Sequence, residues 1–223
     1  MLIVAPDFER RIDLPGAGPC PRPVEIDHTG TGFSELVALR VYSFAKGVAI
    51  DGKAEDDEVF IVAMRGTVHI AITQAGQAAR DFALSDGPGL RVVYMPPHAA
   101  YRLSAQSDCD IAYARARPIG SDAPKVDGFA ATGGRLDIAG HAQGMDLMLV
   151  AAQAGDNIEL GADERFVHVR AHGSISAKLK GASLGDWSTV ALAAGEAAAL
   201  TVEAGSGEIL LIAAATRGDI ETE

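Results

Sequence analysis

The chain has 223 residues, of which 48% are hydrophobic and 22% are charged, which is ordinary for a globular protein with a sizeable buried core. Its 19 basic and 30 acidic residues give a formal charge of −11, and no basic run is longer than Arg10-Arg11. Nucleic acids and anionic membranes attract clustered Lys and Arg, so this balance argues against both as partners.

The cysteine content and the hydrophobic runs lead us to expect a cytoplasmic protein. Two cysteines, Cys20 and Cys109, are too few for a disulfide framework, and neither has a second Cys at metal-ligand spacing. Pro6 and Asp7 interrupt the apolar residues 1–5 too early for a signal-peptide core. No apolar run approaches the roughly 20 residues that a membrane-spanning helix needs.

The first two thirds of the chain predict an extended arm, a β-rich unit and a linker. Residues 1–32 contain five of the ten prolines, which favours an extended arm. Residues 33–118 form the first predicted unit, and Pro96-Pro97 predicts a sharp corner within it. Its predicted strands span residues 36–44, 59–64, 67–72, 91–95, 101–104 and 110–116. Residues 119–144 are rich in Gly and Pro and are predicted to be a linker.

The remaining residues predict a second β-rich unit over 145–217, followed by a tail over 218–223. Its predicted strands span residues 147–153, 158–160, 166–170, 174–179, 189–192, 197–202 and 208–213. The Ala-rich residues 193–200 contain Gly195, and we expect a turn and a strand there, not a helix. Many short strands with no sustained helical period are typical of sandwiches and barrels.

The two units repeat one pattern. Residues 57–70 match residues 163–177 when one residue is inserted in the second copy, and residues 93–103 match residues 190–200. The order of the two blocks is the same in both copies, which indicates a duplicated unit. The alternative is a chance similarity between short strand–turn patterns.

The first copy resembles the cupin fold. The segment from Gly47 to Gly66 and the Pro96-Pro97-His98 corner correspond to its two short motifs. Residues 58–68, 94–98 and 110–116 resemble, more closely, the 5-deoxy-glucuronate isomerase family of inositol catabolism and its pectin-pathway relatives. This resemblance covers about residues 30–118, while the second copy matches only in outline. It implies an all-β bicupin, with two tandem jelly-roll (cupin) β-barrels.

The same resemblance implies a metal held by three histidines and a glutamate, and this sequence departs from that pattern. The corresponding positions hold Lys53, Glu55 and Tyr101 in the first copy, and about Gly161, Asp163, Glu164 and Ala198 in the second. We therefore predict no metal ligands and no cofactor.

Charged residues at the expected mouth of the first barrel are the catalytic candidates. Lys53, Glu55, Glu58 and Tyr101 fall in or beside the cupin motifs, and a carboxylate with a lysine could move a proton between adjacent carbons. His98, at the nearby corner, is a candidate for substrate binding. The alternative is that the charged residues 53–58 form a solvated loop without a catalytic role.

Alternation predicts a substrate pocket. Arg40 and Tyr42 share one face of their strand, and Tyr113 and Arg115 share one face of theirs. If both faces point into the barrel, these side chains converge with Tyr101 and suit a sugar acid or another small anion. Otherwise they cover the surface between the barrels.

His168 and His172 are a weaker candidate for a metal site. Residues 166–172 alternate with period two, so both histidines and Arg170 lie on one face of a strand. A hydrogen-bonded polar stripe is the better interpretation.

Two functions follow from these observations. The first is an aldose–ketose isomerase acting on a sugar acid, and the alternative is a non-catalytic, metal-free bicupin that binds a small carbohydrate or anion. The expected partner is therefore a small-molecule carbohydrate or carboxylate ligand, and a homodimer is a further expectation.

Overall fold

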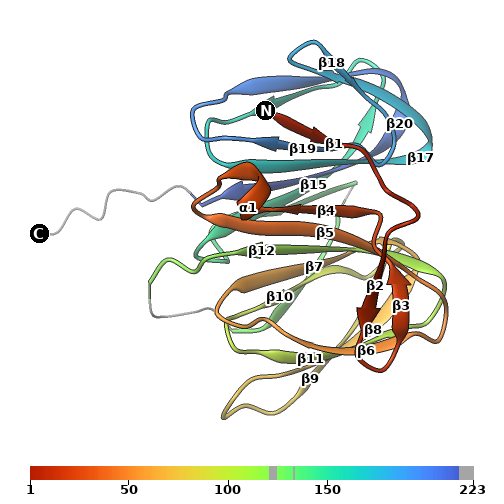
Figure 1. The fold of residues 1–223 in the computed structure, drawn as a ribbon, viewed down its shortest axis with the longest axis vertical. Coiled ribbons are helices and arrows are strands. Elements are labelled where there is room, and N and C mark those ends of the chain that lie inside the picture. The colour runs from red at the N-terminus through yellow and green to blue at the C-terminus, as the bar shows by residue number, and fades with distance from the viewer. Residues whose placement is uncertain (121–124, 133, 216–223) are drawn as a thin grey trace, which may run out of the picture.

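Figure 1 shows the computed structural model, which describes residues 1–120, 125–132 and 134–215, with backbone only for residues 171–173. Two strongly curved sheets are stacked on each other, and the described residues contain a single helical turn, α1 (His28–Thr31). The predicted all-β fold is confirmed.

A ten-stranded sheet forms the first barrel. Its strands are β4 (Val24–Asp27), β5 (Leu36–Phe44), β6 (Ala49–Lys53), β7 (Glu58–Arg65), β8 (Thr67–Thr73), β9 (Arg80–Ser85), β10 (Leu90–Met95), β11 (Ala100–Ala105), β12 (Cys109–Ala116) and β13 (Asp127–Ala130). They pair in the order β4-β5-β12-β7-β10-β9-β8-β11-β6, with β13 added to β10.

An eight-stranded sheet forms the second barrel. Its strands are β1 (Leu2–Val4), β14 (Arg135–Ile138), β15 (Met145–Gln153), β16 (Asn157–Leu160), β17 (Arg165–Leu179), β18 (Ala182–Leu184), β19 (Thr189–Leu192) and β20 (Ala198–Ala214). The order is β1-β19-β17-β20-β15-β14, with β16 on β20 and β18 on β17. The Ala-rich segment is not helical, as predicted.

Strands β17 and β20 each replace two predicted strands. They pair along their length through a register shift between Ala171 and Ile175. Gly205 sits at this bulge with φ +77°, and a Cβ there would lie 1.7 Å from the carbonyl oxygen of Ser174. Only glycine fits so close a backbone approach, and the bulge lets the strands bend without ending.

The predicted N-terminal arm is wrong, because residues 1–32 pair with both barrels. β1 is an edge strand beside β19, and β4 pairs with β5. β2 (Arg11–Leu14) and β3 (Gly18–Pro21) form a hairpin whose Cys20 packs into the core of the first barrel. Short edge strands tolerate proline, so the proline content did not exclude them.

The predicted linker also contributes strands. Within residues 119–144, β13 pairs with β10 of the first sheet and β14 pairs with β15 of the second. Gly128 lets β13 lie close to the first barrel, since a Cβ there would be 2.9 Å from the Phe82 ring. The predicted tail, residues 218–223, lies outside the described part of the chain.

Three apolar clusters hold the fold together, one inside each barrel and one between them. In β7, Val59 and Ile61 face the first barrel's interior, whereas Phe60 and Val62 face the second barrel. There they join residues such as Phe166 of β17. Both faces of β7 are therefore buried, which explains its uninterrupted apolar run, and each such side chain contributes about 1.5–3 kcal/mol.

Two buried carboxylates fasten the barrels to each other. Glu58 Oε1 accepts hydrogen bonds from the Tyr94 hydroxyl (2.7 Å) and the Gln143 amide (3.0 Å), and Oε2 accepts one from the Gly144 amide (2.6 Å). Burial and the bond to Glu58 raise the pKa of Tyr94, which keeps its phenol a donor. Glu58 thus holds the segment that leads into β15 of the other barrel.

Glu164, the counterpart of Glu58 in the second repeat, makes the reciprocal contact. It accepts hydrogen bonds from the amides of Ser34 (2.6 Å), Glu35 (2.9 Å) and Leu36 (3.0 Å), where β5 of the first barrel begins. Burial opposes ionisation, but these amides and the Ser34 hydroxyl outweigh it and hold the pKa of Glu164 below its usual value.

We expect Glu164→Gln to lower the free energy of unfolding at pH 7 by about 2–3 kcal/mol, because a neutral amide cannot replace a carboxylate that accepts several charge-assisted bonds. The lowered pKa means that this contribution is present at neutral pH and is lost as the pH falls through the native value. Urea unfolding measures the change, with the exposed Glu9→Gln as the control. Equal urea unfolding midpoints for Glu164→Gln and Glu9→Gln would contradict a stabilising role of the Glu164 carboxylate.

Candidate functional site

The interior face at one end of the first barrel gathers the predicted arginines and tyrosines. Arg40 pairs directly with Tyr113 across β5 and β12, and Tyr42 pairs with Ile111, which is part of the barrel's core. Arg115 lies two residues beyond Tyr113 on the same face of β12. The structure therefore brings these four predicted residues together inside the barrel, and not on the surface between the barrels.

Tyr101 reaches the same cluster from β11. It lies opposite Gly52 of β6, and a Cβ at Gly52 would be 2.4 Å from the Tyr101 phenol, so glycine makes room for the ring. The Tyr101 and Tyr113 rings are 6.2 Å apart, and the Tyr113 hydroxyl donates a long hydrogen bond of 3.5 Å to the Lys53 carbonyl. Tyr42 stacks on Phe44 beside them, with ring centroids 5.5 Å apart.

Burial fixes the protonation of the phenols. Desolvation raises the pKa of Tyr101, and it raises the pKa of Tyr113 to about 12 although Arg115 opposes it. Both hydroxyls are therefore protonated at neutral pH. They can donate hydrogen bonds to a ligand, but they are poor general bases.

The two guanidiniums are paired but not saturated. Arg115 forms a close ion pair with Asp57, and Arg40 Nε lies 3.5 Å from Glu25 Oε1. Among the described residues, the buried Nε atoms of Arg40 and Arg115 have no hydrogen-bond partner. Their side chains are 24% and 19% exposed, so solvent reaches this end of the barrel.

Sequence reasoning missed two members of this cluster, Asp57 and Glu25. Asp57 lies among the charged residues 53–58 but was not one of the predicted site residues. Glu25 belongs to β4, inside the segment predicted to be an arm. The alternation in Val24-Glu25-Ile26 was a strand signal that could have placed it.

Lys53, Glu55 and His98 do not join the cluster. All three are exposed and line a shallow groove with Thr73. Lys53 follows Gly52, so its side chain lies on the outer face of β6, contrary to the prediction of a place at the barrel mouth. Glu55 and His98 have positive φ (53° and 64°), and the His98 amide donates to the Glu55 carbonyl at 2.6 Å.

Glu58 also differs from its predicted place. Alternation puts it on the face of β7 opposite Val59, where it is buried between the barrels and holds Gln143 and Gly144. Its carboxylate therefore does not reach the Arg and Tyr cluster. Of the four catalytic candidates, only Tyr101 faces the barrel interior.

His168 packs inside the protein. Its Nδ1 lies 2.9 Å from the Thr189 hydroxyl and its ring packs edge-on against Trp187. Burial, with nearby Arg170, lowers its pKa to about 3, against a raising effect of Asp110. The side chain of His172, the second histidine of the expected polar stripe, is outside the described part of the chain.

The donor set does not fit the metal that the cupin resemblance implies. Across the described residues, no three His, Cys, Asp or Glu side chains are grouped so as to hold a metal ion. The first-barrel positions instead present an outward lysine, an exposed glutamate and a buried phenol. We therefore derive no chemistry through a metal.

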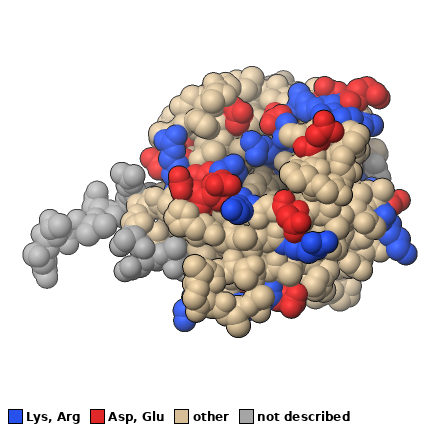
Figure 2. Space-filling model, turned by 60° about the horizontal axis from the view of Figure 1, so that its bottom comes forward, with Lys and Arg blue, Asp and Glu red and all other residues tan. Residues whose placement is uncertain are grey.

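The face of the molecule shown in Figure 2 carries charges of both signs. On the face in Figure 2, Lys and Arg side chains are interspersed with Asp and Glu and form no single basic patch. Within the described residues, no helix has the length and apolar character to cross a membrane.

Comparison with known proteins identifies the family of this chain. The model of the KduI/IolB family matches residues 21–136, more than half of the chain. The chain belongs to the KduI/IolB family. The match covers the first barrel and its cluster, so this KduI/IolB chain is an isomerase-like cupin at the family level. The expected family resemblance is confirmed.

Solved structures share the fold of both barrels. An IolB-like protein from Salmonella typhimurium LT2 is 13% identical, with a TM-score of 0.70 over 98% of this chain and 94% of its own. YhhW from Escherichia coli is also 13% identical, with a TM-score of 0.69 over 96% of this chain and 98% of its own. Oxalate decarboxylase from Lactobacillus farciminis is 10% identical, with a TM-score of 0.70 over 96% of this chain and 86% of its own. A comparison with curated proteins found no match.

We expect the buried His168 to make this KduI/IolB protein sensitive to mild acid. Its native pKa of about 3 lies below the unfolded value of about 6.5, so the unfolded chain binds an extra proton between these values and stability falls as the pH falls. Between pH 7.5 and 5, the wild type should lose about 2 kcal/mol more than His168→Asn. Urea unfolding at both pH values measures this.

The exposed His98→Asn is the matched control and should keep the wild-type pH dependence. Parallel pH profiles for the wild type and His168→Asn would show that this imidazole is not held neutral.

Proposed function

We propose that the first barrel binds a sugar acid through Arg40 and Arg115. The observation that carries this proposal is the buried Nε–H of Arg115, which lacks a hydrogen-bond partner among the described residues, while the Nε of Arg40 is held only by the 3.5 Å ion pair with Glu25. Leaving a charged donor unpaired in a buried site is costly. A ligand carboxylate would supply the missing acceptor, and its two oxygens match the guanidinium fork.

The charge balance of the cluster supports a ligand with one negative charge. The guanidiniums of Arg10, Arg22, Arg40 and Arg115 pair with three carboxylates, those of Asp7, Glu25 and Asp57. Four guanidiniums against three carboxylates leave one positive charge, which a monocarboxylate would neutralise.

The tyrosines account for the carbohydrate part of the ligand. Tyr101 and Tyr113 present protonated hydroxyls that can bond to sugar hydroxyls or to a carbonyl oxygen. The stacked Tyr42 and Phe44 supply a flat apolar wall for the carbon skeleton. A sugar acid uses all three features, whereas an inorganic anion uses only the guanidiniums.

We further propose aldose–ketose isomerisation of that sugar acid, on the basis of KduI/IolB membership. Such a reaction moves a proton between adjacent carbons and needs a base beside the ligand. Lys53, Glu55 and Glu58 lie outside the cluster, so Asp57 is the carboxylate in position. Its carboxylate is already engaged in the ion pair with Arg115, which favours the alternative of binding without catalysis.

We expect Arg115→Gln to weaken binding of D-glucuronate or D-galacturonate about 10- to 100-fold, because a charge-assisted bond contributes about 1.5–3 kcal/mol. Isothermal titration calorimetry on the full chain measures this. Arg102→Gln, which changes an exposed arginine on the opposite face of β11, is the control and should bind like the wild type. Wild-type protein that binds D-glucose as tightly as D-glucuronate would rule out a carboxylate-reading site.

A proton NMR time course in D2O distinguishes catalysis from binding. If the chain is an isomerase, the uronate should convert to its ketose with deuterium entering at the exchanged carbon, and Asp57→Asn should slow this at least 100-fold. A uronate that binds but shows neither conversion nor exchange would establish the non-catalytic alternative.

A further inference from the structure

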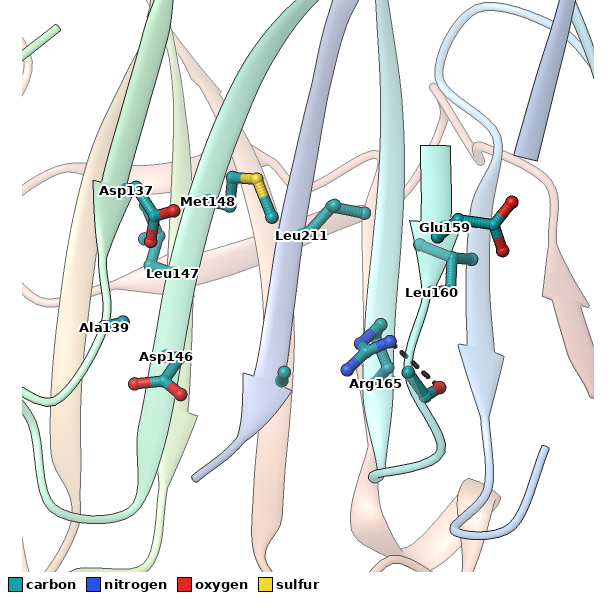
Figure 3. A pocket seen from close by; sticks show the side chains of 11 residues that line it. Asp137, Ala139, Asp146, Leu147, Met148, Glu159, Leu160, Arg165 and Leu211 are labelled. Atoms are coloured by element: carbon teal, nitrogen blue, oxygen red, sulfur yellow. Dashed lines mark hydrogen bonds between the residues drawn. The ribbon is translucent and has the colours of Figure 1, made fainter. Parts of the chain in front are cut away.

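The second barrel contains a cavity of its own, at the end that corresponds to the cluster of the first barrel (Figure 3). The equivalence follows from the strand register. Val59 pairs with Arg115 in the first barrel, and one residue after Glu164, Arg165 pairs with Ala213 in the second. The place of Arg115 is thus taken by alanine and that of Val59 by arginine, and a space of about 230 Å³ adjoins Ala213 and Arg165.

One row of residues across the cavity carries opposite charges. Asp146 of β15, Ala213 of β20 and Arg165 of β17 are register partners on three adjacent strands. Neighbouring strands lie about 4.8 Å apart, so the acid and the base stand on either side of the small alanine, with their backbones about 10 Å apart. Figure 3 shows Asp146 and Arg165 at the same level of the cavity.

Both charged groups keep capacity for a ligand. Asp146 accepts a hydrogen bond from the Gly140 amide at 2.8 Å and has no other partner among the described residues. Arg165 Nη1 donates to the Gly161 carbonyl at 3.0 Å, and its Nη2 is 3.8 Å from Asp163, beyond hydrogen-bond distance. The Arg165 side chain is only 10% exposed and lines the cavity.

The next row of the cavity is apolar except at its outer edge, where the exposed Asp137 of β14 pairs in register with Met148 and forms an ion pair with Arg135. Met148 and Leu211 pair directly above the charged row, and Leu160 faces them from β16 (Figure 3). The Glu159 carboxylate points away from Arg165 in this view. No tyrosine lines this space, so nothing here replaces the phenols of the first barrel.

We propose that this cavity binds an α-amino acid with an apolar side chain. The ligand carboxylate pairs with Arg165, its ammonium group pairs with Asp146, and its side chain packs on Met148, Leu211 and Leu160. A sugar acid is disfavoured, because most of its hydroxyls would face Met148, Leu211 and Leu160, and only the exposed carboxylates of Asp137 and Glu159 at the edge could accept hydrogen bonds from them. The volume is below the about 300–1,000 Å³ of pockets for drug-sized ligands, which matches a single amino acid.

Isothermal titration calorimetry on the full chain tests this with three probes: L-leucine, 4-methylpentanoate, which lacks the ammonium group, and 3-methylbutylamine, which lacks the carboxylate. We expect saturable leucine binding, and binding of each analogue about 10- to 100-fold weaker. No leucine binding at millimolar concentration, or 4-methylpentanoate that binds as tightly as leucine, would overturn the proposal.

Two variants locate the site. Asp146→Asn should weaken leucine binding about 10- to 100-fold, and Ala213→Leu should abolish it by filling the space between the two charges without removing either. The exposed Asp51→Asn is the control, and urea unfolding confirms that each variant is folded. Leucine binding that survives in folded Ala213→Leu would place the ligand elsewhere and refute the assignment.

Discussion

Burial of the contact between the two barrels is the constraint from which the other features follow. Strand β7 is enclosed on both faces, so one side of it must serve the partner barrel. Glu58 and Glu164 are polar groups of this contact, beside the Arg91–Glu208 and Arg170–Asp110 ion pairs, and each of the two glutamates is satisfied by backbone amides of the other barrel. A carboxylate so engaged has no capacity left for a ligand. The candidate ligand sites accordingly lie on the interior faces at the barrel ends.

The two barrels provide two such ends, and their side chains differ. The register equates Arg115 with Ala213 and Val59 with Arg165, so a guanidinium enters each barrel from a different strand. In the first barrel, tyrosines fill the remaining space and their raised pKa values keep them as donors. In the second, leucine and alanine leave the space open. Equivalent backbone positions therefore recognise different ligand chemistry.

Local sequence signals predicted the parts of the fold that depend on local periodicity. The strands at residues 36–44 and 189–192 have the predicted bounds, and alternation correctly grouped the arginines with the tyrosines. Partners far apart in sequence were not predictable, so β1 and β4 were assigned to an arm. Glu58 was misplaced for an avoidable reason. The alternation that points Val59 into the first barrel points Glu58 toward the second barrel. The charged residues around Glu58 suggested a catalytic site, but in the structure Glu58 forms a contact between the barrels.

The replacement of imidazoles by phenols and guanidiniums reverses the charge of the ion that the first barrel can hold. Histidines and a glutamate present lone pairs and a negative charge, which attract a divalent cation. Tyr101 and Tyr113 present hydrogen-bond donors at neutral pH, and the arginine cluster carries one uncompensated positive charge. Such a site repels a cation and attracts an anion. Gly52 makes this exchange possible, because only a residue without Cβ leaves room for the Tyr101 ring. Under the proposed function, the first barrel therefore contacts the ligand carboxylate directly.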